Sequence, residues 1–308
     1  MVTYYKNQNG LTQAQNRNEA NWISVVCPTP QEKQFLLEEL KVPEAFYNDI
    51  EDIDERPRIE IEDGWHLIIV RIPYKSNDVR LPYTTVPLGL VFKEDVFVSI
   101  CFAQSELIED FPKYTQRKSI EPGNHFDLVL RLLLSSSIWF QKYLKQINQL
   151  IKLAENNLEK SIRNEDLQAL LQIEKCLVFF ITSIKGNEVL FYRVRNLKAQ
   201  KDSYDEDLIE DVEIELRQAQ DTTNIYSDIL TGTMDAYASV ISNNLNIIMK
   251  RLTSISIILM IPTLVASFYG MNVPNSLQDN HNGFWIVALA SFIVSVIGVV
   301  MFKKKNLF

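Results

Sequence analysis

Polar, small and methionine side chains recur at regular steps through an otherwise apolar segment near the C-terminus. From Asn246 to Ser267, steps of three and four residues reach only such side chains, while Ile, Leu and Val dominate the positions between them. Steps of this size place residues on one face of an α-helix. A polar face gains nothing from lipid, so it either joins helices in an oligomer or lines a channel. This polar stripe consists of Asn246, Met249, Thr253, Ser256, Met260, Thr263 and Ser267.

The stripe lies mostly within the first of two segments that are long and apolar enough to cross a membrane. Residues 252–269 contain no charged side chain, and neither do residues 284–302. At 1.5 Å per residue, helices of this length match the ~30 Å hydrocarbon layer of a bilayer. The sequence therefore predicts a transmembrane domain over 251–308, with spans at about 252–269 and 284–302 and an outer loop at 270–283.

Flanking charges predict the orientation of the two spans. Lys250 and Arg251 precede the first span and Lys303–Lys305 follow the second, whereas the connecting loop holds only Asp279. Positive charge collects on the cytoplasmic side, and residues 1–21 lack the apolar core of a signal peptide. We expect a multi-pass protein of the cell (plasma) membrane with both termini cytoplasmic. Two helices per chain cannot enclose a pore, so a pore would require several chains around an axis.

Proline usage divides the remainder of the chain. Nine of the 11 prolines lie in residues 1–122, and none lies in 123–261. We expect an α/β (α+β) cytoplasmic domain in the first part and a long-helix cytoplasmic stalk over 123–250 in the second, because proline interrupts helices. The last helix would extend from Asp205 to Tyr269, roughly 98 Å at 1.5 Å per residue. The expected elements are strands at 66–72, 87–92 and 96–102, a turn at 93–95, and helices at 29–40, 43–50, 126–162, 165–198 and from 205.

Charge and composition restrict the class of partner. The net charge is −8, and residues 1–251 alone contain 38 acidic and 28 basic side chains. An acidic body disfavours nucleic acid and favours cations. An acidic run at 205–215 is either a solvated helix start or a regulatory site.

Catalytic and cofactor motifs are not evident. The three cysteines are widely spaced, the three histidines are far apart, and no phosphate-binding loop or nucleophile motif is present. We therefore expect no enzyme activity and no cofactor.

One tripeptide identifies a family. Gly270-Met271-Asn272 directly follows the first span, and a Lys-rich tail follows the second. In this context the tripeptide resembles the signature of the CorA family of divalent-cation channels. The resemblance extends to residues 54–60, 88–102 and 242–250, and it covers roughly residues 30–308.

The resemblance implies a funnel-shaped homopentamer that carries Mg²⁺ inward, and often Co²⁺ or Ni²⁺ as well. It places a selectivity filter at Gly270, Met271 and Asn272. It also implies regulation by cytoplasmic Mg²⁺ at Asp211 and Asp235, with Asp78 as the candidate partner across a subunit interface. Combined with the stripe, it gives a pore lining and gate of Asn246, Met249, Leu252, Ser256, Met260, Thr263 and Ser267.

The residue types at the filter suit magnesium. Mg²⁺ retains its waters, so neutral amide and carbonyl oxygens can bind the hydrated ion without holding it too tightly. Membrane potential would supply about 4.6 kcal/mol per 100 mV for a divalent ion. The outer loop departs from the family because it lacks the Met-Pro-Glu-Leu stretch, which reduces its acidic ring to Asp279.

Two other functions remain open on sequence grounds. One is a Zn²⁺, Co²⁺ or Ni²⁺ transporter of the same family, for which His281 is the only nearby candidate ligand. The other is a membrane-tethered helical scaffold or sensor, which would have no need of the polar stripe.

Overall fold

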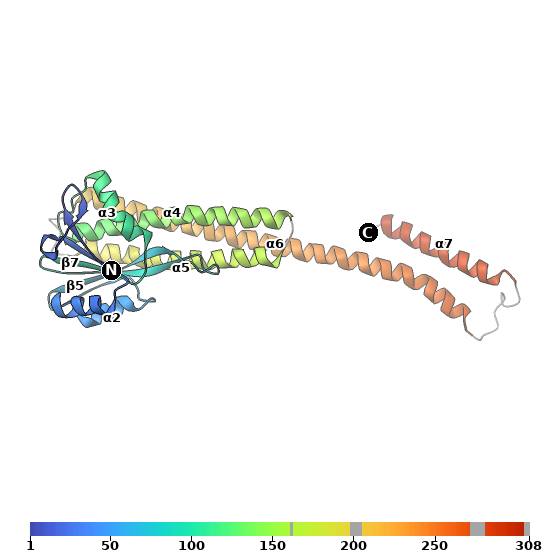
Figure 1. Cartoon of the computed structure of the whole chain (residues 1–308). Coiled ribbons are helices and arrows are strands. Elements are labelled where there is room, and N and C mark those ends of the chain that lie inside the picture. Colours follow the sequence, from blue (N-terminus) through green and yellow to red (C-terminus); the bar gives the residue numbers. More distant parts are fainter. Residues whose placement is uncertain (161–162, 198–204, 272–280, 305–308) are drawn as a thin grey trace. The chain divides into compact units, whose positions relative to one another are not determined.

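The computed structural model describes residues 1–160, 163–197, 205–271 and 281–304 (Figure 1). Contacts divide the chain into two compact units, Met1–Gly232 and Thr233–Phe308. The first unit contains a sheet and long helices, which confirms the mixed α and β class expected from the sequence.

A seven-stranded sheet forms the centre of the first unit. Its strand order is β2-β1-β3-β7-β6-β5-β4. Neighbouring strands are antiparallel except for β3 and β7, which are parallel. The strands are β1 Val2–Asn7, β2 Leu11–Gln13, β3 Trp22–Val26, β4 Arg58–Glu62, β5 Trp65–Lys75, β6 Tyr83–Lys93 and β7 Val96–Cys101.

Local signals placed several of these elements correctly. The turn expected at residues 93–95 joins β6 to β7, where Lys93 pairs with Val96. The helix α1 (Pro30–Gln34) begins with a capping box, in which the Thr29 hydroxyl accepts from the Glu32 amide and the Glu32 carboxylate accepts from the Thr29 amide. It continues as the π-helical turn η2 (Phe35–Glu39), and α2 (Glu44–Glu51) follows.

Burial shows that the sheet is covered on both faces. Every residue of β5 from Leu67 to Pro73 is buried. Because successive strand residues point to opposite faces, this pattern requires packing on both sides. The helix α2 lies on one side of the sheet, and α3 (Glu106–Lys118) and α4 (His125–Lys160) lie on the other (Figure 1).

Buried polar side chains join the sheet to helix α5 (Asn164–Arg195). The Asn187 side chain accepts from the Arg71 amide at 2.9 Å and donates to the Arg71 carbonyl at 2.7 Å. The Arg71 guanidinium donates to the Thr85 carbonyl at 2.7 Å, and the hydroxyls of Thr85 and Ser183 are 2.7 Å apart. These bonds satisfy polar groups that would otherwise be costly to bury.

Three described helices are long and apolar enough to cross a membrane: α5, α6 (Glu206–Tyr269) and α7 (Gly283–Lys304). The sequence predicted only the last two. The buried apolar side chains of α5, such as Leu177, Phe180 and Leu190, have another explanation, because this helix packs against α4 and strands β4, β5 and β6. Core packing and membrane crossing both demand apolar side chains, so composition alone cannot separate them.

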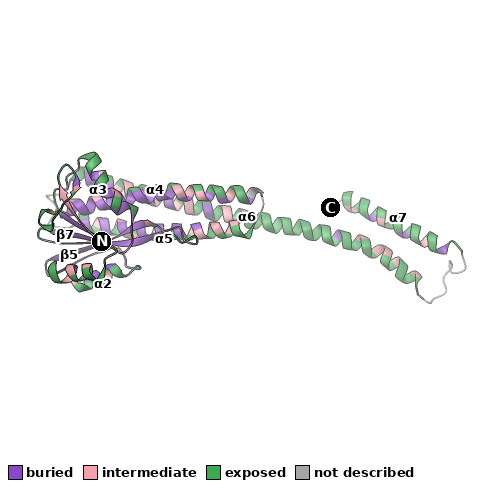
Figure 2. Ribbon diagram, viewed as in Figure 1, coloured by how far each residue is buried: buried purple, intermediate pink, exposed green. Residues whose placement is uncertain are grey.

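Helix α6 is a single element of 64 residues. It begins one residue after the predicted Asp205 and ends at the predicted Tyr269. Before Gly232 its apolar residues Leu208, Val212 and Leu216 are buried, whereas most of its later residues are exposed (Figure 2).

Candidate functional site: the exposed face of helix α6

Helix α7 packs against one face of α6 in the second unit. Ser254 of α6 is only 3% exposed, and Ser291 of α7 is 9% exposed. A Cβ built on Gly298 of α7 would lie 3.8 Å from side-chain carbons of both Ile258 and Ile261. The two helices therefore meet at Gly298, where the absence of a side chain leaves room for Ile258 and Ile261.

The polar stripe lies on the face that α7 does not cover. Each of its seven residues is exposed, and so is Leu252, which is 58% exposed. Ser256 lies two residues beyond the buried Ser254, which is about 200° around an α-helix. The polar side chains of the stripe therefore point away from α7.

A groove of about 510 Å³ runs along this face. Three of its lining residues belong to the stripe, Met260, Thr263 and Ser267, and the others are Ile257, Ile261 and Leu264. Two hydroxyls of the stripe are oriented by the backbone of α6. Ser256 Oγ donates to the Leu252 carbonyl at 2.9 Å, and Thr263 Oγ1 donates to the Leu259 carbonyl at 3.0 Å.

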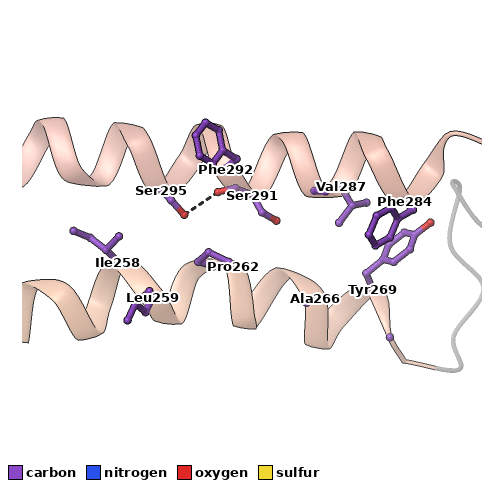
Figure 3. A pocket seen from close by; sticks show the side chains of 12 residues that line it. Ile258, Leu259, Pro262, Ala266, Tyr269, Phe284, Val287, Ser291, Phe292 and Ser295 are labelled. Carbon is purple, nitrogen blue, oxygen red and sulfur yellow. Dashed lines mark hydrogen bonds between the residues drawn. The ribbon is translucent and has the colours of Figure 1, made fainter.

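A second hollow, of about 580 Å³, separates part of α6 from α7 (Figure 3). Pro262 and Ala266 line it from α6, and Phe284 and Val287 line it from α7. Ser291 and Ser295 point toward α6, and Ser295 Oγ donates to the Ser291 carbonyl at 2.9 Å. Like the groove on the opposite face, this hollow is lined mainly by apolar side chains.

The predicted filter residues are only partly described. Helix α6 ends at Tyr269, where the Gly270 amide donates to the Ala266 carbonyl at 2.9 Å, and Met271 is 53% exposed. Asn272 and Asp279 lie outside the described residues, as does Lys305.

The three predicted regulatory carboxylates are all exposed. Asp78 lies in the loop between β5 and β6, where its carboxylate accepts from the Arg80 amide at 2.8 Å. Asp211 and Asp235 lie on α6, one in each unit. In the part of the chain that the structure describes, no three His, Cys, Asp or Glu side chains are grouped to hold a metal ion.

Several carboxylates of the acidic run have local partners. Glu213 pairs with Arg195 at 3.0 Å and with Arg217 at 3.4 Å. Asp205 accepts from the amides of Asp207 and Leu208, which caps the start of α6. Helix capping and ion pairing therefore explain the presence of Asp205 and Glu213 in the acidic run. They do not explain Asp211.

The thiols are poor candidates for metal binding. Burial raises the pKa of Cys101 to about 12 and also raises the pKa of Cys176, which keeps both protonated. Cys27 is exposed.

Sequence reasoning did not identify the bonds that Arg71 and Asn187 make. A signal was available, because Arg71 is the one charged residue inside the apolar run from Leu67 to Ile72. A charged residue at a core position predicts buried hydrogen-bond partners.

Comparison with known proteins gives a family and a fold. The model of the family described as "CorA-like Mg2+ transporter protein" matches residues 17–304. The "Cobalt/magnesium transport protein CorA" of Methanocaldococcus jannaschii is 26% identical over 291 residues, which cover 92% of this chain and 90% of that protein. The protein of the same name from Thermotoga maritima is 26% identical over 266 residues, which cover 84% and 74% of the two chains.

Solved structures agree with this fold. The complete structure of the CorA magnesium transporter from Methanocaldococcus jannaschii superposes with a TM-score of 0.85 at 22% identity and covers 99% of this chain and 98% of that one. The full-length CmaX protein gives a TM-score of 0.71 at 14% identity and covers 98% and 96% of the two chains.

Proposed function

This chain belongs to the CorA family of Mg²⁺ transporter proteins, and from that membership we propose that it is the subunit of a channel that carries Mg²⁺ into the cell. The single observation that carries the proposal is the exposed polar stripe on the face of α6 opposite α7. Curated relatives are named as cobalt/magnesium transport proteins, so Co²⁺ is the natural second cargo. No catalytic role is proposed.

We propose that α7 and the second part of α6 are the two spans. Lys250 and Arg251 mark the cytoplasmic end of the first span, and Lys303 and Lys304 mark that of the second. Tyr269, Phe284 and Trp285 lie at the opposite ends, where aromatic side chains favour the membrane interface. Helix α5 is assigned to the soluble part, because it packs against the sheet and α4.

A pore follows from repetition of this arrangement. One chain offers one polar helix face, and copies of that face around an axis would enclose a path while each α7 faces the lipid. The number five rests on the family resemblance. Residues 1–122 would form the rim of the funnel, 123–250 its stalk and 251–308 the membrane part. The proposed path is lined by Asn246, Met249, Leu252, Ser256, Met260, Thr263 and Ser267, with Gly270, Met271 and Asn272 as its outer filter.

Membrane potential is the proposed driving force, since an inside-negative potential of ~100 mV favours entry of a divalent ion by about 4.6 kcal/mol.

Regulation is assigned to Asp211, Asp235 and Asp78. All three are exposed, so copies of the chain could bring them together. Mg²⁺ bound between subunits would offset their repulsion and hold the channel closed.

Uptake of Mg²⁺ by sealed liposomes tests the proposed function. Liposomes that hold the purified full-length protein and an internal Mg²⁺ dye are given an inside-negative potential. We expect uptake with the parent, a loss of at least about tenfold with Asn272→Ala because a filter acceptor is removed, and parental uptake with Asn244→Ala. Absence of uptake by an intact parental oligomer would refute the proposal.

The regulatory assignment is tested with Mg²⁺ sealed inside the liposomes. Asp211→Lys should relieve the inhibition of uptake by this internal Mg²⁺, and unchanged inhibition would refute the assignment.

A further inference from the structure

The hollow between α6 and α7 has the depth of one leaflet of a bilayer. Its lining residues extend from Ile258 to Gly270 on α6 and from Phe284 to Ser295 on α7. At 1.5 Å per residue, the rise from Ile258 to Tyr269 is about 16.5 Å, and the rise from Phe284 to Ser295 is the same. Half of the ~30 Å hydrocarbon layer is about 15 Å. The hollow therefore occupies the outer half of the proposed span.

Packing of the two helices explains why this space exists. Toward the cytoplasmic end they meet at Gly298, where an added Cβ would lie 3.8 Å from the Ile258 side chain. Toward the outer end the residues that face the space include Ala266 and Ala288, whose side chains are too short to fill it (Figure 3). The two backbones are thus separated by a space that the side chains of this chain do not occupy.

The volume of the hollow excludes a helix of another copy of the chain. It measures about 580 Å³, which over ~16.5 Å gives a mean cross-section of about 35 Å². A helix that is ~10 Å wide needs about 79 Å². Water is also a poor occupant, because a cavity lined mainly by apolar side chains stays dry.

A single acyl chain has the right size and chemistry. At about 30 Å³ for each water-sized group, the hollow holds about 19 such groups, close to the number of carbons in one long acyl chain. A chain in this position contacts both helices, and these dispersion contacts would be lost if the space were empty. The depth, the volume and the lining therefore agree on the same ligand.

The outer end of the hollow suits the headgroup of such a lipid. Tyr269 and Phe284 line this end, and their rings lie close to each other (Figure 3). Aromatic side chains favour the interface between hydrocarbon and water. A lipid headgroup can therefore stay at the interface while one of its chains enters between the helices.

We propose that this hollow is a lipid-binding site, which takes one acyl chain of an outer-leaflet phospholipid and holds the headgroup beside Tyr269 and Phe284. The inference rests on the proposed two-span arrangement and adds to it a ligand of the membrane part. The bound chain fills the space on the side of α6 opposite the polar stripe, so it supports the stripe without entering the path of the ion.

Native mass spectrometry of the full-length protein tests the site. The protein is reconstituted with palmitoyl-oleoyl phosphatidylcholine, extracted in a mild detergent and weighed as the intact oligomer, which also shows that each variant assembles. We expect one retained phosphatidylcholine per chain. Dihexanoyl phosphatidylcholine should be retained about tenfold less, because its short chains make fewer contacts.

Substitutions that fill the hollow should remove this lipid. Ala288→Phe from α7 and Ala266→Leu from α6 each place a larger side chain in the hollow, and each should lower retention at least about tenfold, since the two fillings act independently from opposite walls. Ala290→Phe is the matched control, because position 290 lies about 200° around α7 from position 288. It should retain phosphatidylcholine as the parent does.

Three results would overturn the inference. One is a parental oligomer that retains no phosphatidylcholine. Another is parental retention by an assembled Ala288→Phe or Ala266→Leu oligomer. The third is an equal loss in Ala290→Phe, which would place the lipid on the general surface of α7. Lipid retention does not require transport, so a parent that keeps one lipid per chain but takes up no Mg²⁺ would refute the channel and leave the lipid site in place.

Discussion

Arg71 illustrates how a single buried charge fixes the shape of the first unit. It is 8% exposed, and its guanidinium donates to the Thr85 carbonyl and to the carbonyls of Ile53 and Glu55. Burial lowers the pKa of Arg71, while the charges of Asp54 and Asp52 oppose that shift. An arginine stays protonated in proteins. Carbonyl dipoles therefore stabilise its charge, and the segment before β4 is held against the sheet.

Protonation of the His66 side chain is expected to destabilise the folded state at mildly acidic pH. Its ring stacks on Phe92 at 4.9 Å, and its Nδ1 is buried without a hydrogen-bond partner in the described part of the chain. Burial is the main cause that lowers the pKa of His66, and the neighbouring His125 lowers it further, while the Gly64 backbone opposes both. Protonation therefore costs more in the folded than in the unfolded state.

We predict that the folded state loses stability as the pH falls below about 6.5, where the unfolded histidine takes up its proton first. The stability lost in this way is fully present above that pH. Thermal unfolding of the full-length protein in detergent, followed between pH 7.5 and 5.5, would show it as a falling Tm. His66→Gln should flatten the pH dependence, and an unchanged slope in that variant would contradict the assignment.

At the scale of elements, two glycines in long helices have opposite surroundings. A Cβ on Gly186 of α5 would lie 2.8 Å from Pro57 Cγ, closer than real Cβ atoms approach, whereas a Cβ on Gly232 of α6 would meet nothing within 4 Å. Gly186 is thus required by the docking of the segment before β4 on α5. Gly232 has no such packing role.

We predict that Gly186→Ala lowers the stability of the full-length protein by about 1–3 kcal/mol, because overpacking outweighs the helix propensity of alanine. Gly232→Ala should raise stability by up to about 1 kcal/mol, since alanine loses less conformational freedom in a helix. Thermal melts of both variants in detergent check this pair. A stabilised Gly186→Ala would show that Pro57 moves aside without cost.

Elements with strong local signals could be predicted, and elements that depend on distant partners could not. Residues close in sequence determine the Thr29 cap, the turn at 93–95 and the proline-free helices, so these elements were predicted from the sequence. Strands β1 and β2 lie in a polar N-terminal stretch and exist because β1 pairs with β3. Likewise, the parallel pairing of β3 with β7 joins segments more than 70 residues apart, which no local pattern reveals.

At the scale of the whole molecule, the sequence predicted that the stripe residues share one helix face, but it did not predict where α7 lies relative to that face. The spacing of the stripe predicted one helix face, and the structure adds that α7 covers the opposite face. The same apolar criteria also select α5, and its contacts with the sheet and α4 account for its buried apolar residues. Whether copies of the stripe face one another depends on contacts between chains, which a single chain does not contain.

The central claim is that the exposed face of α6, and not the hollow against α7, is the path of the ion. The most direct measurement introduces Thr263→Cys or, as the control, Ser295→Cys, each with Cys27→Ser to remove the exposed native thiol. Mg²⁺ uptake by liposomes is measured before and after treatment with a water-soluble cationic thiosulfonate. We predict that the reagent labels Cys at position 263 and stops uptake, and that uptake through the Ser295→Cys variant is unchanged. Unchanged uptake after complete labelling at position 263, or block from position 295 alone, would contradict the account.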